Sequence, residues 1–289
     1  MVCVHPFYKG GIPLPCGHCM PCKIMRSHQW AMRLMFELRD WSSAAFITLT
    51  YRDADLPPNL RKRHVQLFFK RLRKSLGGRK IKYYAVGEYG DVTHRPHYHA
   101  IVYGLDSDDL EDRMLIKNAW IYADWACLPS KAIGSVTYDS CRYVAGYVQK
   151  KLYGKSGKAY YEENGLTPPF SICSRGLGLD FAIENADFLK ESGLVRIDKH
   201  VMALPRYYRE KLHIDKKKLN EMMRDKEQED FLRFARIFSS KFGSEFSLSD
   251  QNDYDMAYMY YLSERKKSAK LREQTVNSKI SLYNKHSEV

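Results

Sequence analysis

Apolar side chains recur along the chain with two different spacings. Between residues 23 and 41, Trp30, Leu34, Leu38 and Trp41 recur every three or four positions, which predicts a helix with one buried face. Four other segments are short and rich in β-branched and aromatic residues, as strands are. The predicted strands are residues 44–51 (AAFITLTY), 81–90 (IKYYAVGEYG), 96–104 (PHYHAIVYG) and 132–138 (AIGSVTY).

Residues 59–82 combine a helical apolar stripe with many basic residues and no acidic one. The stripe consists of Val65, Phe68, Phe69, Leu72 and Leu76. This pattern predicts a helix that packs through one face and presents a basic face to solvent. Gly77 and Gly78 are expected to end it, because glycine readily adopts the backbone conformation of a helix C-terminus.

Two more helices are predicted, over residues 107–127 and 139–154, the second capped by Asp139 or Ser140 and ended by Gly154. After the first helix the order is therefore β-α-β-β-α-β-α, and its first six elements match the ferredoxin-like plan. The short loop between the second and third strands implies an antiparallel pair. The sequence thus predicts an α+β fold, with a four-to-five-stranded antiparallel sheet backed by helices.

Three segments differ in composition. Residues 1–41 form a Cys-rich lead and the first helix, and residues 42–180 hold the predicted sheet. Residues 181–289 are mixed at first and then highly charged, which indicates a helical extension with little sign of its own core. We find no run of about 18 apolar residues that would span a membrane and no secretory signal near the N-terminus.

The 289 residues carry 47 Lys and Arg against 34 Asp and Glu, a net charge of +13. Such an excess favours an anionic partner, most often nucleic acid, although a basic protein without such a partner would look the same. The ten basic residues of segment 59–82 favour contact with phosphates over a merely solvated face. The candidate DNA-binding residues are Arg61, Lys62, Arg63, Lys70, Arg71, Arg73 and Lys74.

Four of the seven cysteines lie within the first 22 residues. Cys16, Cys19 and Cys22 have C-x-x-C-x-x-C spacing, which favours a four-coordinate zinc site. Cys3 is the expected fourth ligand, with His18 as its substitute. An iron–sulfur site uses similar spacing, and free thiols are the third alternative.

His97 and His99 lie two residues apart on a predicted strand, so their side chains point to the same side of the sheet. Glu88 lies near the end of the neighbouring strand and can reach the pair across a hairpin. Two imidazoles and a carboxylate suit a divalent metal with coordination positions left open. Without further signals, an H-x-H pair is more often two ordinary strand residues.

Tyr143 and Tyr147 are spaced i and i+4 on the last predicted helix, so both phenols lie on one helical face, and Lys150 shares roughly that face. Paired helical tyrosines most often serve packing. A tyrosine can also be a covalent nucleophile once its phenol, with an ordinary pKa of about 10, loses its proton. A nearby cation or metal favours that loss.

Three motifs in this order, FITLTY, RPHYHAIVYG and YVAGYVQKKLYG, resemble the HUH endonuclease superfamily. Together with PCGHCMPC near the start and the GEYG strand, they resemble most closely the replication initiators of microviruses, the gokushovirus-like phages with single-stranded DNA. The resemblance covers roughly residues 16–180. Each motif alone is weak, whereas three in the right order are specific.

The resemblance implies roles for individual residues. His97 and His99 match the metal-binding pair, and Glu88 matches the usual third ligand. Tyr143 and Tyr147 match the two nucleophiles of the double-tyrosine branch. Lys150 matches a lysine three residues after the nucleophile, which points to Tyr147 as the counterpart of the single tyrosine. Gly146 stands where some relatives carry a lysine between the tyrosines, so that role passes to Lys150 or Lys151.

The implied activity is rolling-circle initiation by metal-dependent nicking and joining of single-stranded origin DNA through a 5′-phosphotyrosyl intermediate. Mg²⁺ or Mn²⁺ is the implied catalytic ion, and a host helicase and polymerase are the implied partners, in the cytoplasm of a bacterial host. Two alternatives remain open. One is a plasmid or mobile-element HUH nickase, and the other is a non-enzymatic ferredoxin-like module that binds nucleic acid.

Overall fold

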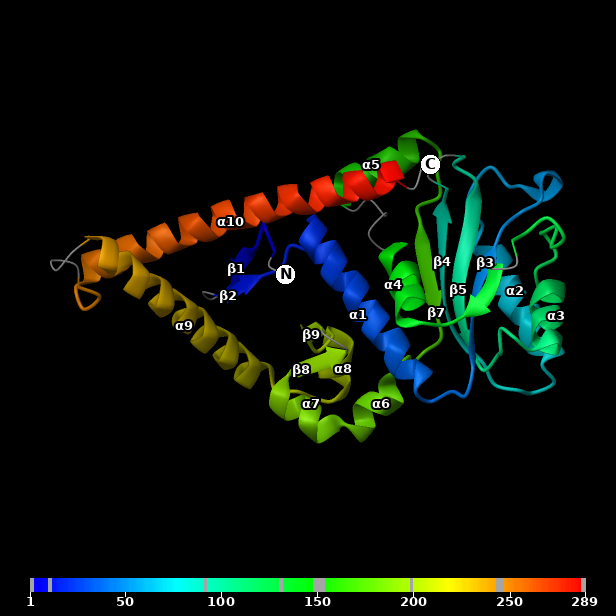
Figure 1. The fold of residues 1–289 in the computed structure, drawn as a ribbon, viewed down its shortest axis with the longest axis horizontal. Helices are drawn as coiled ribbons and strands as arrows, with labels where there is room; N and C mark the ends of the chain where they lie inside the picture. Colours follow the sequence, from blue (N-terminus) through cyan, green and yellow to red (C-terminus); the bar gives the residue numbers. More distant parts are fainter. Residues whose placement is uncertain are drawn as a thin grey trace. The chain divides into compact units, whose positions relative to one another are not determined.

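The computed structural model describes residues 3–9, 12–90, 93–129, 132–147, 154–197, 200–242 and 247–286. The chain divides into two compact units (Figure 1). We call Arg26–Leu212 the sheet unit, and Met1–Met25 with His213–Val289 the terminal unit. The predicted segments 1–41, 42–180 and 181–289 cut the chain at other points, because composition along a chain does not show that its two ends fold together.

The sheet unit is built around one five-stranded antiparallel sheet in the order β6-β3-β5-β4-β7. Its strands are β3 (Ala44–Leu49), β4 (Lys82–Tyr89), β5 (Pro96–Tyr103), β6 (Ile133–Ser135) and β7 (Phe170–Cys173). The four predicted strands therefore lie in the order fourth, first, third, second, which agrees with the ferredoxin-like plan. The predicted α+β class with a four-to-five-stranded sheet is confirmed.

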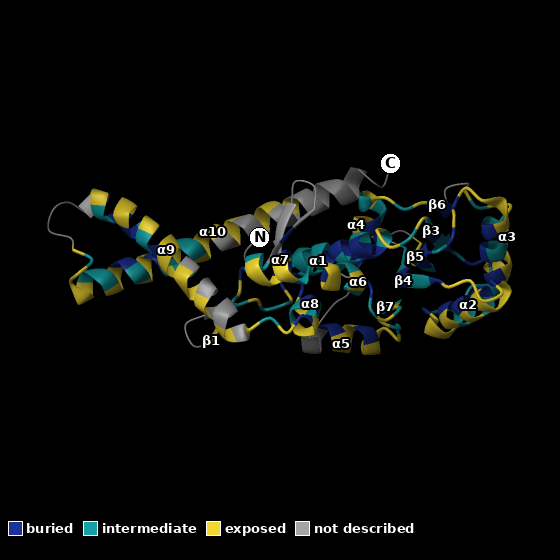
Figure 2. Cartoon of the chain, turned by 90° about the horizontal axis from the view of Figure 1, so that it is seen from below, coloured by how far each residue is buried: buried dark blue, intermediate teal, exposed yellow. Residues whose placement is uncertain are grey.

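One face of the sheet is covered by α2 (Lys62–Ser75) and α3 (Leu110–Ala119). The predicted apolar stripe of α2 is fully buried against this face. Gly77 and Gly78 follow the helix with positive φ angles of 58° and 100°, a conformation that glycine adopts without strain. The buried strands and the exposed outer turns of the helices are visible in Figure 2.

The other face is covered by the part of α1 (Met20–Leu38) that follows Met25 and by α4 (Tyr138–Gly146). Leu34 of α1 and Val144 of α4 pack with Tyr84 and Ile101 of the central strands. Alternate residues of β4 and β5 thus face different helices, and most of them are buried. The candidate histidines lie on the face that α4 covers.

The predicted helix over 107–127 is too long, because α3 ends at Ala119. Trp120 leaves the helix with ψ at 88° and is fully buried in the core between sheet and helices. Its indole Nε1 donates a hydrogen bond of 2.6 Å to the carbonyl oxygen of Thr50. Burial of this large ring redirects the chain, and a pattern of apolar spacing does not reveal that.

The cap of α4 also differs from the prediction, because Thr137 caps the helix in place of Asp139 or Ser140. The Ser140 amide donates to the Thr137 hydroxyl at 3.2 Å, and the Thr137 amide donates to the Ser140 hydroxyl at 2.7 Å. These reciprocal bonds form a capping box. The predicted end of this helix at Gly154 falls after residues 148–153, which lie outside the described residues, and Gly154 begins another helix.

Smaller elements complete both units. In the sheet unit they are a 3₁₀ turn (Asp53–Asp55), α5 (Gly154–Glu163), α6 (Leu179–Glu184), α7 (Ala186–Ser192), α8 (Arg206–Lys211) and a hairpin of β8 (Leu194–Ile197) with β9 (His200–Ala203). The terminal unit holds β1 (Phe7–Lys9), β2 (Ile12–Leu14), α9 (Lys216–Phe242) and α10 (Gln251–His286). Across the residues that the structure describes, no helix combines the length and apolar character of a membrane span.

The expectation that the charged C-terminal extension has little core of its own is wrong. An aromatic cluster joins α9 to α10. Its buried members are Phe231, Ala235, Phe238, Ala257 and Tyr261. Large rings give sufficient buried area from few residues, so this core escapes a reading of mean composition.

A buried carboxylate ties three elements of the sheet unit together. Glu37 of α1 is fully buried. It accepts hydrogen bonds from the Trp41 indole at 2.7 Å and from the Gly178 amide at 2.7 Å. The Lys82 ammonium of β4 lies 2.8 Å from the same carboxylate. The negative charge is therefore both paired and hydrogen-bonded, as a buried charge requires.

Glu37→Ala is expected to destabilise the sheet unit by about 3–5 kcal/mol, because it leaves the Lys82 charge partly buried without its main partner. Denaturant unfolding of the purified chain would measure this loss. Asp180→Ala is the matched control, since Asp180 lies 3.4 Å from Lys82 but is 63% exposed. That control should cost no more than about 1 kcal/mol. Equal losses in both variants would contradict the assigned role of Glu37.

Candidate functional site

Glu88, His97 and His99 meet on the α4 face of the sheet. Glu88 of β4 is the direct partner of His97 on β5, so strand register alone brings the carboxylate beside the imidazole. His97 Nε2 lies 2.8 Å and His99 Nε2 lies 3.6 Å from the same oxygen, Glu88 Oε1. One ligand atom from each residue falls within 4.8 Å of the others. The predicted three-residue group is therefore assembled in the folded chain.

The other ring nitrogens of the two histidines are held by neighbouring groups. His97 Nδ1 lies 3.1 Å from the carbonyl oxygen of Arg95, which only accepts, so this nitrogen carries the proton. His99 Nδ1 lies 3.1 Å from the hydroxyl of Thr48, its strand partner on β3. Such contacts orient an imidazole so that Nε2 presents its lone pair to a metal ion.

Burial makes this donor set chemically demanding. Glu88 is 2% exposed and His99 is 5% exposed, while His97 is half-buried. In neutral His97, Nε2 would direct a lone pair at the Glu88 carboxylate, which is an unfavourable contact unless positive charge lies between them. A divalent cation supplies such charge, and two imidazoles with one carboxylate are ligands that it prefers. The three residues therefore fit a divalent metal.

Both candidate tyrosines lie against this group from α4. The Tyr147 ring stacks on the His99 ring, with centroids 4.9 Å apart and planes within 2°. The Tyr143 ring meets His99 edge-on at 5.3 Å and Tyr147 at 4.9 Å. Tyr147 is 7% exposed, whereas Tyr143 is 50% exposed. Helical i, i+4 spacing thus places one phenol inside the site and the other at its solvent edge.

The buried phenol is strongly perturbed. Burial raises the pKa of Tyr147 well above its ordinary value, and the Glu88 carboxylate and a hydrogen bond with Tyr143 raise this pKa further. The Tyr147 hydroxyl is therefore protonated in the ion-free chain. For its oxygen to act as a nucleophile, the negative charge of the site must be offset by a cation.

Sequence reasoning missed two side chains that shape the site. Phe46 of β3 stacks on His99 at 5.7 Å and meets the Tyr143 ring edge-on at 6.1 Å. Thr48, two residues further along the strand, orients His99 as described above. Both alternate on β3 with buried core residues, and this period of two was the signal that could have assigned them to the histidine face.

Lys150 and Lys151 lie outside the described residues, and their predicted role stays a prediction. The basic residues of α2, by contrast, are described. Six of the seven candidates are exposed: Arg61, Lys62, Arg63, Lys70, Arg73 and Lys74. Arg71 is half-buried, and its Nε donates a hydrogen bond of 2.7 Å to the carbonyl oxygen of Ala119, so it supports the packing of α2 on α3.

The helix α2 covers the face of the sheet opposite to the histidines, but its two ends differ in their distance from them. The Arg61 amide, just before α2, donates a hydrogen bond of 2.8 Å to the hydroxyl of Tyr98. Tyr98 stands between His97 and His99 on β5. The guanidinium of Arg73 lies over the ring of Tyr83, at the other end of the sheet. The start of α2 is therefore the part nearest the candidate site.

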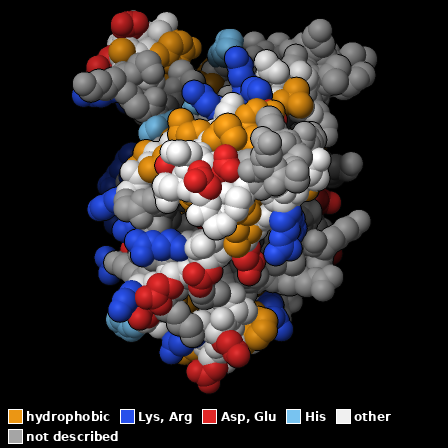
Figure 3. Space-filling view, turned by 90° about the vertical axis from the view of Figure 1, so that its left-hand side faces the viewer, with side chains coloured by type: hydrophobic (Ala, Val, Ile, Leu, Met, Phe, Trp, Pro, Cys, Tyr) orange, Lys and Arg blue, Asp and Glu red, His pale blue; other side chains and the backbone are white. Residues whose placement is uncertain are grey.

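Other parts of the surface carry mixed charge. The face shown in Figure 3 intersperses Lys and Arg with Asp and Glu side chains. On α2 (Lys62–Ser75), in contrast, every charged side chain is basic. This helix is thus a surface along which a phosphate backbone could run without meeting a carboxylate.

The N-terminal cysteines also gather. The sulfur atoms of Cys3, Cys16, Cys19 and Cys22 lie within 4.8 Å of one another in the terminal unit. Cys3 therefore takes the fourth place in the group, for which His18 was the substitute.

Comparison with known proteins identifies the family. A family model described as replication-associated protein ORF2 matches residues 44–152. The chain is 33% identical over 221 residues to the replication-associated protein ORF2 of Spiroplasma virus 4, covering 68% of this chain and 66% of that relative. It is 33% identical over 158 residues to the replication-associated protein VP4 of Bdellovibrio phage phiMH2K, covering 48% of each. It is 30% identical over 235 residues to the replication-associated protein ORF4 of Chlamydia phage 1, covering 72% of this chain and 55% of that relative.

The chain spans between about half and about two thirds of the length of these relatives. No solved structure matches it at a significant level. The stretch matched by the family model contains Glu88, both histidines and both tyrosines of the site. On these matches the chain belongs to the family of replication-associated proteins named for ORF2, of the kind carried by the virus and phages named above.

Proposed function

We propose that this protein initiates rolling-circle replication by nicking and rejoining single-stranded origin DNA through tyrosine. The observation that carries the proposal is the stack of Tyr147 on His99, which brings a phenol into hydrogen-bonding contact with Glu88. A packing tyrosine has no reason to lie within a group of metal ligands. Membership in a replication-associated family gives this geometry its biological setting.

Glu88, His97 and His99 would hold Mg²⁺ or Mn²⁺, and the bound ion would polarise the scissile phosphodiester and offset negative charge. The residues of the chain perform the remaining tasks. Thr48 and the Arg95 carbonyl orient the two imidazoles, and Phe46 packs against the ring of His99. The α4 helix presents the phenols, so the nucleophile is positioned before DNA binds.

The proposed reaction is a transesterification. The phenolic oxygen of Tyr147 forms a bond to phosphorus, and the bond between phosphorus and the 3′ oxygen breaks. The phenol loses one proton and the departing oxygen gains one, so the products are a 5′-phosphotyrosyl link and a free 3′-OH. The same step in reverse joins strands. The free 3′-OH can prime a polymerase, and both that polymerase and a helicase are proposed to come from the host.

Formation of a covalent adduct tests this proposal directly. The full chain is incubated with oligonucleotides that cover the origin strand and with Mg²⁺ or Mn²⁺, and the products are separated on a denaturing gel. We expect a protein–DNA adduct of retarded mobility that disappears in EDTA and after protease digestion. DNA binding without any adduct, for every oligonucleotide and both ions, would instead support a non-enzymatic DNA-binding protein.

The basic residues at the start of α2 give a further prediction. Replacing Arg61, Lys62 and Arg63 with glutamine should weaken DNA binding for every sequence, because contacts with phosphates do not depend on the base. For single-stranded DNA, the slope of log affinity against log salt should flatten by about 2 if all three residues contact phosphates. Fluorescence anisotropy at several salt concentrations measures both effects.

A matched control removes three exposed lysines elsewhere in the sheet unit, Lys158, Lys190 and Lys211. This variant loses the same net charge but should keep its salt slope. A triple variant at the far end of α2, with Lys70, Arg73 and Lys74 replaced, tests how far the DNA follows the helix. Equal slopes in the first variant and in the lysine control would show that the start of α2 holds no DNA.

A further inference from the structure

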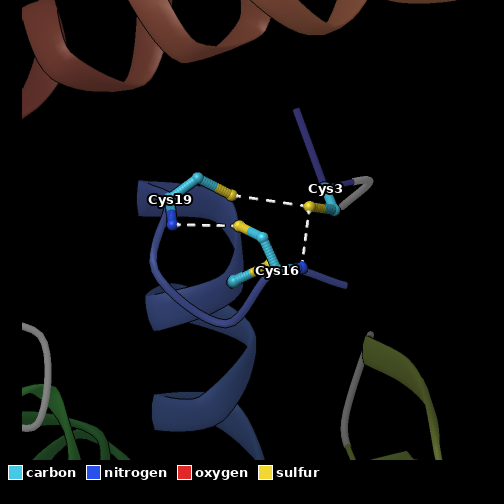
Figure 4. Close-up of side chains that lie close together, drawn as sticks. Cys3, Cys16 and Cys19 are labelled. Carbon is cyan, nitrogen blue, oxygen red and sulfur yellow. Dashed lines mark hydrogen bonds between the residues drawn. The ribbon is translucent and has the colours of Figure 1, made fainter. Parts of the chain in front are cut away.

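We propose that Cys3, Cys16, Cys19 and Cys22 bind one structural zinc ion that orders the start of the terminal unit. The proposal does not depend on the nicking activity proposed above. The sulfurs come from separate stretches of chain: Cys3 precedes β1, Cys16 follows β2, and Cys19 and Cys22 lie at the start of α1 (Figure 4). Four thiols that converge from these positions have a common focus rather than a chance proximity.

The spacing of the sulfurs fits a tetrahedral ion. Zinc lies about 2.3 Å from each of four thiolates, and a tetrahedron of that size has sulfur–sulfur edges of about 3.8 Å. The Sγ atoms of Cys3 and Cys19 are 3.8 Å apart. A disulfide would bring two sulfurs to about 2.0 Å, and all four cysteines are free thiols. The cluster therefore has the dimensions of a metal site and not of a crosslink.

Backbone amides already surround the sulfurs. The Cys16 amide donates to Cys3 Sγ at 3.3 Å, and the amides of His18 and Cys19 both donate to Cys16 Sγ at 3.4 Å. Two of these contacts are drawn in Figure 4. Amide donors stabilise the negative charge of a thiolate, which is the form that binds metal. The loop between Cys16 and Cys19 is thus folded as a ligand loop before any ion binds.

The donor set selects among metals. Calcium and magnesium prefer oxygen ligands, whereas four sulfurs in a tetrahedral arrangement suit zinc or iron. Because all ligand atoms lie within 4.8 Å of one another, the space between them holds a single ion rather than a cluster of irons and sulfides. With every coordination position taken by protein, the ion would be structural and not catalytic.

The surrounding fold has little else to stabilise it. The strands β1 and β2 are three residues long, and the buried hydrophobic residues packed around the cluster are Val4, Cys19 and Cys22 themselves. So short a hairpin is marginal alone, and a structural metal is a common substitute for a core. Within the terminal unit, Pro6 and Tyr8 also line a cavity of about 570 Å³ together with Arg265 of α10. Zinc would therefore hold one wall of this cavity in place.

Metal analysis of the full chain, purified with reductant and without chelator, tests the proposal. We expect about one zinc per chain, both in the wild type and in the variant His97→Ala with His99→Ala, which removes the other candidate metal site. Cys19→Ser and Cys22→Ser should each lower the zinc content at least about tenfold. Cys127→Ser is the matched control, because Cys127 is an exposed thiol outside the cluster, and it should keep its zinc.

A second measurement does not rely on the folding of any variant. Chelation of the wild type should speed hydrogen exchange in residues 3–22 while β3, β4 and β5 exchange as before, and added zinc should restore the slow exchange. Protein that contains no zinc, that contains iron in its place, or that carries a disulfide among these cysteines would overturn the proposal. So would zinc that is lost in the Cys127 control as readily as in Cys19→Ser.

Discussion

The double substitution His97→Ala with His99→Ala is expected to abolish DNA cleavage and leave DNA binding near the wild-type level. His97 and His99 share one Glu88 oxygen at 2.8 and 3.6 Å, so removing both imidazoles leaves a single carboxylate at the site. One carboxylate cannot hold a divalent ion with the affinity of three ligands. Loss of metal assistance is worth several kcal/mol, which corresponds to a rate lower by about a thousandfold or more. The exposed basic residues of α2 are untouched, so affinity for DNA persists.

Two controls separate this loss from misfolding. His94→Asn removes a nearby exposed histidine whose φ of 51° asparagine also tolerates, and it should cleave normally. Glu88→Gln keeps the shape of the third ligand but not its charge, and it should need much more Mn²⁺ for the same rate. Cleavage and binding are followed on the same labelled oligonucleotide. If the double variant cut at the wild-type rate, or if EDTA left the wild type unaffected, the metal assignment would be wrong.

The elements that place this site could be predicted because they depend on local rules. Alternation along a strand puts His97 and His99 on one side, and a short hairpin forces Glu88 into the opposite position. The 3.6-residue period of a helix does the same for Tyr143 and Tyr147. Each inference needs only a few neighbouring residues, so the sequence carries it without knowledge of the whole fold.

The missed features depend on contacts between distant segments. Phe46 and Thr48 reach His99 only because β3 pairs with β5 in one register, and a single strand does not contain that register. The fifth strand, β7, went unpredicted because four residues in a mixed region give little periodicity. Its Phe170 ring lies so close to Gly87 that a side chain on Gly87 would meet it at 3.0 Å. The glycine next to Glu88 therefore records a contact that no local pattern announces.

The division of labour between the two tyrosines is the second result with a large expected effect. Tyr147→Phe should reduce the first cleavage by about a hundredfold or more, because it removes the hydroxyl that contacts Glu88 while its ring can still stack on His99. Tyr143→Phe should still nick but fail at strand transfer and at repeated rounds. Tyr143 is half exposed at the edge of the site, where it can attack a second phosphate while Tyr147 holds the first link.

Peptide mapping of the covalent adduct decides between alternation and a single nucleophile. With a substrate that carries two origin copies, the wild type should yield phosphotyrosyl peptides at both Tyr143 and Tyr147, and the double phenylalanine variant should yield none. Tyr160→Phe serves as the control, since Tyr160 is an exposed tyrosine on α5 and its loss should change neither step. A link found at neither tyrosine would remove both from catalysis. A link found only at Tyr147 would leave Tyr143 as a residue that packs against Phe46 and His99, and closing the circle would then need a second copy of the protein.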